Sequence, residues 1–241
     1  MARKKTPTPA REAARPGPLQ RLRRAVLRIV AVLLALVVLA VAIFGVLDPP
    51  TTPYMIAEGR RLGGPVDHEW VPLEQMAPTI PRAVVAAEDA NFCAHWGFDL
   101  DAIRSALAAG GTRGASTISQ QTVKNVFLWQ GRSWPRKALE AAITPLAEAL
   151  WTKRRMLEIY LNVAEFGEGT FGIEAAAWRY FRAPPNALTD HQAALLAAIL
   201  PDPKGRSAAD PSDGVARRAR AIRDGAATIA ADGRAACFAP D

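Results

Sequence analysis

Two neighbouring acids, Glu88 and Asp89, follow an apolar run whose three- and four-residue spacing predicts a helix over residues 81–91. Adjacent helix residues point about 100° apart. If Glu88 faces a cleft, Asp89 therefore turns away and can hold the helix end or His95. The alternative is a pair of solvated carboxylates, because charged side chains are usually exposed.

A second polar segment, residues 114–125, reads GASTISQQTVKN. Its hydroxyl and amide side chains can hydrogen-bond sugar hydroxyls and phosphate oxygens. Ser116 or Thr117 could cap the helix that follows, and a helix N-terminus attracts anions. A polar surface turn followed by a helix is the alternative, although two adjacent glutamines close to a lysine exceed what a cap requires.

A third unit combines cations with an acid. Arg132 comes first, and Arg136 and Lys137 then precede Glu140 by four and three residues. A helix brings the last three side chains to one side. By themselves these residues indicate an ordinary ion-pair patch on an amphipathic helix.

Helices are the elements expected to position these groups. Apolar residues recur at helical spacing, whereas the valine-, isoleucine- and threonine-rich alternation of a sheet is nearly absent. Thr189 and Gln192 have the form of a capping box, and Pro145 predicts a kink. The predicted helices cover residues 81–91, 100–109, 117–128, 135–161, 172–181 and 189–199.

The charge of the chain is concentrated near its N-terminus. The 241 residues carry a net charge of +7, but residues 1–28 hold nine basic residues and one acid. The rest of the chain has 21 basic and 22 acidic residues, a net charge of −1. A basic nucleic-acid-binding domain is therefore not supported, and we expect no nucleic acid as a partner.

Residues 29–47 contain neither a charge nor a proline, and 19 helical residues suffice to cross a hydrocarbon core of roughly 30 Å. We predict a basic cytoplasmic tail (1–28), a transmembrane helix (29–47), a linker (48–65) and a globular domain (66–241). A signal peptide cleaved near Ala40-Val41-Ala42 is the alternative. Outside the cytoplasm Cys93 and Cys237 could oxidise, but the sequence does not show that they meet.

Several familiar motifs are absent or lack their context. Residues 167–172 match GxGxxG, yet a helix, not the strand of a βαβ unit, is expected before them. The sequence contains no S-x-x-K with K-T-G, no G-x-S-x-G, no H-E-x-x-H and no Walker motif. Its three histidines show no metal-ligand spacing, and His191 is expected to be exposed in the first turn of a helix.

Four motifs together resemble those of the peptidoglycan glycosyltransferases, the polymerising domains of class A penicillin-binding proteins. They are E-D-x-x-F-x-x-H-x-G (88–97), G-x-S-T-I-S-Q-Q-x-x-K-N (114–125), R-K-x-x-E (136–140) and K-x-x-x-L-E-x-Y-L-N (153–162). The likeness extends over residues 70–203. Because the chain has a span but no transpeptidase motif, it is most similar to the monofunctional members.

Three positions depart from the family pattern. Ala115 stands where a second glycine is common, and Ser119 where threonine is common. Residues 180–183 read YFRA where the family often has YFGK, which leaves a role for Arg182 open. The first two changes keep backbone room and a hydroxyl group.

The resemblance implies a mainly α, lysozyme-like glycosyltransferase domain that joins lipid II units with inversion. A hydroxyl nucleophile needs a base, whereas a pyrophosphate leaving group needs cations. By resemblance, Glu88 is the base, and Glu140 is a second essential carboxylate that positions the donor pyrophosphate or its divalent ion, Mg²⁺ or Mn²⁺. The other implied binding residues are Asp89, Phe92, His95, Ser116, Thr117, Gln120, Gln121, Lys124, Asn125, Arg132, Arg136 and Lys137.

The implied partners are lipid II, the growing lipid-linked glycan, the bilayer, and proteins of cell-wall synthesis or division. The implied location is the bacterial inner membrane, with an extracytoplasmic catalytic domain. Residues 127–129 and Trp134 are the best stretch for touching the bilayer, although these aromatic residues could equally be core. The competing functions are a lytic or hydrolytic muramidase and an inactive membrane-anchored scaffold.

Overall fold

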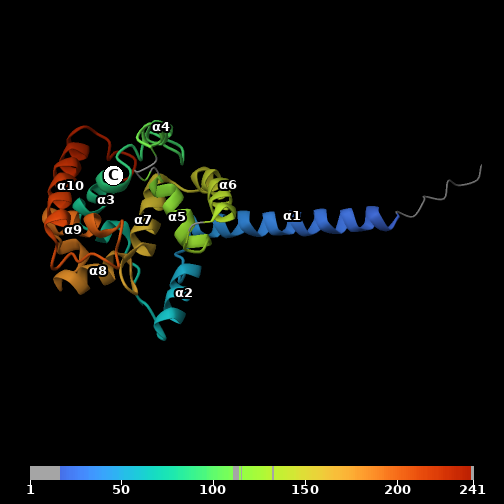
Figure 1. Cartoon of the computed structure of the whole chain (residues 1–241), viewed down its shortest axis with the longest axis horizontal. Coiled ribbons are helices and arrows are strands. Elements are labelled where there is room, and N and C mark those ends of the chain that lie inside the picture. The colour runs from blue at the N-terminus through green and yellow to red at the C-terminus, as the bar shows by residue number, and fades with distance from the viewer. Residues whose placement is uncertain (1–16, 111–113, 115, 132, 240–241) are drawn as a thin grey trace, which may run out of the picture. The chain divides into compact units, whose positions relative to one another are not determined.

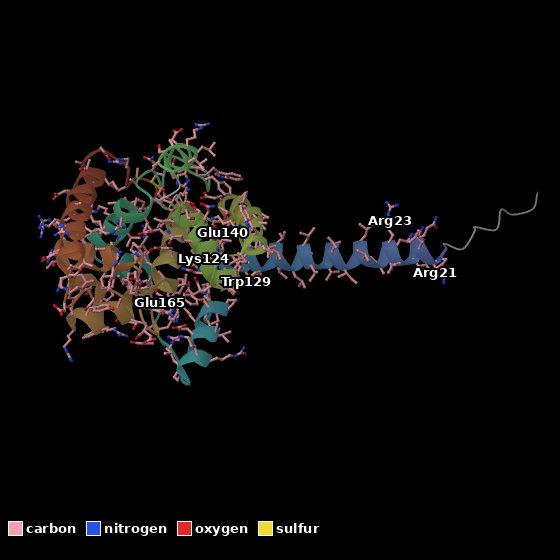
Figure 2. The ribbon with its side chains drawn as sticks, viewed as in Figure 1. Arg21, Arg23, Lys124, Trp129, Glu140 and Glu165 are labelled. Atoms are coloured by element: carbon pink, nitrogen blue, oxygen red, sulfur yellow. A yellow bond between two sulfur atoms is a disulfide. The ribbon has the colours of Figure 1, made fainter. Side chains whose placement is uncertain are left out.

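A computed structural model describes residues 17–110, 114, 116–131 and 133–239. Its contacts divide the chain into two units, residues 1–40 and 41–241. Helix α1 (Pro18–Phe44) is the one helix among the described residues that is long and apolar enough to cross a membrane (Figure 1). Figure 2 labels Arg21 and Arg23 in its basic first part. The expected span, residues 29–47, runs three residues beyond the end of α1.

The second unit is mainly helical, as expected. Its described α-helices are α2 (Pro53–Leu62), α3 (Thr79–Glu88), α4 (Leu100–Ala108), α5 (Ile118–Phe127), α6 (Trp134–Leu150), α7 (Lys153–Val163), α8 (Gly172–Phe181), α9 (Asp190–Ile199) and α10 (Asp213–Ala231). Two short 3₁₀ helices, η1 (Leu73–Gln75) and η2 (Pro185–Ala187), connect them.

The single helix predicted over residues 135–161 is wrong, because α6 and α7 are separate helices. The backbone of Trp151 is extended, and its buried indole donates a hydrogen bond to the Val41 carbonyl at 2.7 Å. The hydroxyl of Thr152 then caps α7 by accepting a hydrogen bond from the Arg155 backbone N–H. Pro145 lies inside α6 without ending it. The hydrogen bond of the Trp151 indole and the Thr152 cap therefore break the helix, although the apolar pattern continues through this point.

Two helices were not predicted. Helix α2 lies in the segment expected as a linker, where Thr52 caps it, Pro53 occupies its first position and Gly63 ends it with a φ of 74°. Helix α10 follows the last predicted helix and packs against α3 and α9 (Figure 1). The capping box expected at Thr189 and Gln192 is present at the start of α9.

Three short strands form a small sheet in the order β1-β3-β2. Strand β1 (Asp67–His68) is parallel to β3 (Thr170–Phe171), and β2 (Glu165–Gly167) is antiparallel to β3. The GxGxxG segment forms the hairpin between β2 and β3, not a βαβ unit. Gly172 has a φ of 81°, and a Cβ there would lie 2.7 Å from the Asn162 carbonyl oxygen. Close backbone packing therefore accounts for this glycine.

The core surrounds α7. Its largest fully buried side chains include Phe92, Tyr160, Phe166 and Phe171. The open question about the cysteines is also answered, because Cys93 and Cys237 form a disulfide. This bridge joins the loop after α3 to the segment after α10, so two distant parts of the sequence are held beside the end of α3.

Candidate active site

Glu88 and Asp89 stand at the C-terminal end of α3 and point to different neighbours. Asp89 ends the helix, accepts a hydrogen bond from the Ile118 backbone N–H at 3.0 Å, and lies 2.8 Å from His95 Nε2. The expectation that Asp89 turns toward His95 is therefore confirmed. Because Ile118 begins α5, the same carboxylate also fixes the start of α5 against the end of α3.

The Glu88 carboxylate is largely enclosed and has one partner on each oxygen. The Gln121 amide nitrogen donates to Oε2 at 3.0 Å, and Arg218 Nη2 lies 3.5 Å from Oε1. Burial raises the pKa of Glu88, and the charge of Asp89 adds to this increase. The Gln121 hydrogen bond and the charges of Arg218 and Lys124 oppose it. A carboxyl with a raised pKa is better suited to accept a proton than a solvated one.

Helix α5 lies beside the end of α3 and contributes further polar side chains to the candidate site. Thr117 and Gln120 form a reciprocal capping box, and the Thr117 hydroxyl also donates to the Gly97 carbonyl at 2.7 Å. Both side chains are buried. Asn125 is buried as well and accepts a hydrogen bond from Gln130. These three polar groups hold the framework of the site, and their contact with substrate stays a prediction.

Helix α6 brings Arg136, Lys137 and Glu140 together, as their spacing predicts. Arg136 Nη1 lies 2.7 Å from one Glu140 carboxylate oxygen, and the Lys137 ammonium donates to the other. Lys137 also donates to Ser116 Oγ at 3.2 Å. Glu140 is 2% exposed, so its charge is compensated almost entirely by these two cations.

Lys124 faces this group from α5, and we call Lys124, Arg136 and Lys137 the cation cluster. Figure 2 labels Lys124 and Glu140 on the two helices. Burial lowers the pKa of Lys124; the charge of Glu140 opposes this decrease, and the charges of Arg136 and Lys137 add to it. Within the described parts of the chain, no carboxylate lies within ion-pair distance of its ammonium. The cluster therefore favours an added anion.

Open space borders both the carboxylate and the cations. Glu88, Asp89, Ser116 and Thr117 line a cavity of about 290 Å³. Ser133, Trp134, Arg136 and Lys137 line a second one of similar size. Ser116 lines the first cavity and contacts Lys137 of the second, so it stands between the candidate base and the cation cluster.

Other predicted residues lie deeper or elsewhere. Phe92 is fully buried against Phe238, with the Lys153 ammonium 4.5 Å from its ring centre. His95 is almost completely buried and orients Asp89. Arg132 lies outside the described residues. The structure therefore gives Phe92 and His95 clear packing and orienting contacts, and leaves their contact with substrate a prediction.

The proposed membrane-contact stretch is divided between surface and core. Trp134 is 88% exposed and Trp129 is 47% exposed. Leu128 is buried, and Phe127 packs against the core beside Trp151. The two tryptophans are therefore the part of this stretch available to a bilayer.

The motif over residues 153–162 mainly builds the framework. The Asn162 side chain bonds both backbone groups of Val71 at 2.9 Å, and Glu158 accepts from the Leu73 backbone N–H at 2.9 Å. Tyr160 reaches the site indirectly, because its hydroxyl donates to Gln121 Oε1 at 3.2 Å. This motif thus anchors the segment before α3 and orients a residue that contacts Glu88.

Sequence reasoning missed Arg218, which reaches Glu88 from α10. The signal for this helix was present, since Val215, Ala219, Ile222 and Ile229 share one helical face and are buried. Many arginines and small residues surround them and hide the apolar pattern. The pairing itself depends on packing between helices that are far apart in sequence.

The residues do not fit a metal ion held by the protein alone. Among the described residues, no group of three or more His, Cys, Asp or Glu could hold one. Both carboxylate oxygens of Glu140 already contact cations. The cation cluster therefore offers positively charged nitrogen groups, whereas Mg²⁺ and Mn²⁺ prefer oxygen ligands.

Comparison of the sequence with known proteins identifies a family. The transglycosylase family model matches residues 57–227. A biosynthetic peptidoglycan transglycosylase from Jannaschia sp. (strain CCS1) is 60% identical over 220 residues, covering 91% of this chain and 92% of that protein. One from Caulobacter vibrioides is 45% identical over 225 residues, covering 90% and 96%. The chain therefore belongs to the transglycosylase family, in the group of biosynthetic peptidoglycan transglycosylases.

Proposed function

We propose that this chain polymerises lipid II into glycan strands by inverting glycosyl transfer, without transpeptidase activity. The product linkage is β-1,4, and undecaprenyl pyrophosphate is released. The observation that carries the proposal is the placement of Glu88 and the cation cluster on either side of Ser116. One side can accept a proton, and the other can receive a departing anion.

The reaction uses these groups in a single displacement. Glu88 takes the proton of the acceptor 4-hydroxyl, and that oxygen attacks the anomeric carbon of the donor from the face opposite the pyrophosphate. The bond from that carbon to the pyrophosphate oxygen breaks, and its electron pair leaves with the pyrophosphate. The cation cluster neutralises the departing charge. Attack from the opposite face converts the α-linked donor into a β product.

Glu140 has a positioning role in this scheme. Its two oxygens bind Arg136 and Lys137, so it holds at fixed places both of the cations that would neutralise the donor phosphates. Ser116 and Gln121 would hold sugar or phosphate oxygens, and the remaining predicted binding residues would support α3, α5 and α6 around them. Both Glu88 and Glu140 would thus be required, for different physical reasons.

The divalent cation enters only as a property of the bound donor. Mg²⁺ or Mn²⁺ would be held by the pyrophosphate oxygens themselves, since the protein offers a cationic cluster there instead of a carboxylate cage. Such an ion would supply additional neutralisation of negative charge. The residue chemistry described above does not depend on it.

The membrane layout follows from α1 and the nature of the substrate. We propose that α1 anchors the chain in the bacterial inner membrane with its basic end in the cytoplasm. The catalytic domain then faces lipid II outside the cytoplasm, and Trp129 and Trp134 contact the bilayer interface. Proteins of cell-wall synthesis or division are the proposed macromolecular partners.

The rival functions make different demands on the site. A muramidase must protonate a poor glycosidic leaving group and has no use for the cation cluster. A scaffold requires neither an enclosed carboxylate nor a buried cation. The joint presence of Glu88 and the cation cluster supports transfer from a pyrophosphate donor.

The test is incubation of the detergent-solubilised protein with labelled lipid II and a divalent ion, with products separated before and after muramidase digestion. Glu88→Gln is the test variant, and Glu69→Gln is its control because Glu69 is exposed. Muramidase-sensitive polymer from wild type and control, with none from Glu88→Gln, is expected. No polymer from any folded protein would support the scaffold, and shortening of preformed glycan would support the muramidase.

A further inference from the structure

Helix α10 packs directly against the helix that carries the candidate base (Figure 1). A Cβ atom on Gly225 would lie 3.4 Å from the Cβ of Ala86, which shows how closely α10 and α3 approach. The Cys93–Cys237 disulfide joins the segments that follow these two helices. The position of α10 relative to the end of α3 is therefore fixed at two places.

Arg218 extends from α10 to the last turn of α3. Its Nη2 donates to the Ala87 carbonyl at 3.3 Å and lies 3.5 Å from Glu88 Oε1. One contact ties the guanidinium to the backbone immediately before the base, and the other places its charge on the base itself. One nitrogen, Nη2, makes both contacts, so the guanidinium lies between the last turn of α3 and the Glu88 carboxylate.

The groups facing Glu88 come from each neighbouring element. Asp89 is a second acid at the same helix end, but it is occupied by His95 and the Ile118 backbone N–H. From α5, Gln121 donates a neutral hydrogen bond, and Lys124 acts at longer range. Tyr160 of α7 contacts Gln121. Among the described residues, Arg218 supplies the one cation within 4 Å of the Glu88 carboxylate.

We propose that Arg218 is a positioning residue that keeps Glu88 ionised and fixes the direction of its carboxylate. With Arg218 on Oε1 and Gln121 on Oε2, the carboxylate cannot rotate freely. The proposal rests on the proposed function, in which Glu88 accepts the proton of the acceptor hydroxyl. Arg218 acts through Glu88 and transfers no proton itself.

This role has a consequence for turnover. After Glu88 accepts the proton, its neutral carboxylic acid lies beside an unpaired guanidinium charge. Loss of that proton to solvent restores the ion pair, so Arg218 favours the return of the base to its active form. Removal of Arg218 should raise the pH at which the base becomes active, while the chemistry at high pH is retained.

The experiment compares kcat/KM for lipid II across pH in full-length wild type, Arg218→Gln, Arg218→Lys and Arg217→Gln. Arg217 is an exposed neighbour on the same helix and provides a matched control. We expect Arg218→Gln to move the acid limb to higher pH by about one unit. One unit corresponds to about a tenfold loss on the acid side, largely recovered at alkaline pH. Arg217→Gln should follow the wild-type profile.

Arg218→Lys separates charge from packing. We expect lysine to keep the acid limb near that of wild type, with a lower kcat/KM at every pH because the shorter side chain loses the hydrogen bond to the Ala87 carbonyl. It also keeps the test decisive if Arg218→Gln does not fold. A shift of the acid limb in Arg218→Lys as large as in Arg218→Gln would overturn the charge argument.

Two further outcomes contradict the inference, and one contradicts the proposed function. An unshifted acid limb in Arg218→Gln, or an equal loss at every pH, would mean that Arg218 is only structural or irrelevant. Polymerisation by Glu88→Gln would instead remove Glu88 as the base, whatever the arginine variants do. Thermal unfolding of each variant in the same detergent shows which losses come from misfolding.

Discussion

The Tyr160 hydroxyl lies 3.2 Å from Gln121 Oε1, and this hydrogen bond turns the amide nitrogen of Gln121 toward Glu88. Burial raises the pKa of Tyr160 well above its ordinary value, so the phenol remains a donor throughout the working pH range. A carbonyl acceptor at Oε1 leaves the amide nitrogen as the group that faces Glu88. A fully buried core residue therefore determines which end of an active-site amide meets the candidate base.

Tyr160→Phe should therefore reduce polymerisation without unfolding the protein. Phenylalanine keeps the buried ring but leaves Gln121 free to rotate its amide. We expect kcat/KM to fall about threefold to tenfold, the equivalent of one hydrogen bond. Tyr180→Phe is the control, since its hydroxyl donates to the Phe166 carbonyl and not to Gln121. Equal activity of the two variants would show that the Gln121 orientation is unimportant.

Lys137→Ala should weaken the donor side of the reaction. The substitution removes one cation from Glu140 and the hydrogen bond to Ser116. We expect the apparent KM for lipid II to rise and kcat to fall, by about tenfold or more in kcat/KM. Lys137→Arg retains the charge, so its kcat/KM should lie between that of wild type and that of Lys137→Ala. Steady-state kinetics at constant detergent concentration measures both parameters. If neither KM nor kcat changed, Lys137 would only form an ion pair at the surface.

The helices that carry the motif residues are easier to predict from the sequence than the contacts between those helices. Glu88, Lys124 and Glu140 follow the local sequence signals, since each lies on a helix that the apolar spacing predicts. The break at Trp151 depends on a tertiary hydrogen bond to Val41, which no local pattern contains. Similarly, the approach of Arg218 to Glu88 depends on how α10 packs on α3.

Residues of the same type within the motif over residues 114–125 have different roles, which the sequence alone does not distinguish. In the segment that begins α5, Thr117 and Gln120 satisfy each other as a capping box, whereas Gln121 faces Glu88. Adjacent positions on a helix point in different directions, so one glutamine supports the fold and the next contacts the base. The sequence predicts that such a segment is polar, and only the packing of α5 shows which polar groups remain available.

Reduction of the Cys93–Cys237 disulfide should destabilise the domain. The bridge closes a loop with a sequence separation of 144 residues, and such a long cross-link restricts the unfolded chain strongly. We expect the free energy of unfolding to fall by about 2–5 kcal/mol on reduction. Thermal unfolding with and without reductant measures this. The double variant Cys93→Ser/Cys237→Ser should be as unstable as the reduced wild type, and reductant should not change its stability. A wild-type melting temperature that did not change on reduction would contradict the prediction.

Helix α2 is attached to the domain by a buried ionic cluster that gives a further prediction. Glu58 is 5% exposed and pairs with Arg61 of its own helix and with Lys204, each at 2.5 Å. Tyr54 of the same helix donates to Glu165. The Arg61 hydrogen bonds, followed by that of Lys204, lower the pKa of Glu58 from 4.5 to about 2, despite the opposing effect of burial. Its ionised form therefore stabilises the folded chain.

Glu58→Gln should accordingly destabilise the protein in a pH-dependent manner. A carboxyl whose pKa is lowered by folding contributes its full stability above pH 4.5, and this contribution is lost as the pH falls toward 2. We expect a loss of about 2 kcal/mol near pH 7, because Arg61 is half exposed and its pairing is partly screened. Denaturant unfolding at pH 7 and pH 3 provides the measurement, with Glu69→Gln as the exposed control. The gap between variant and wild type should narrow at pH 3, and a gap that stayed constant would show that shape and packing, not charge, hold α2 in place.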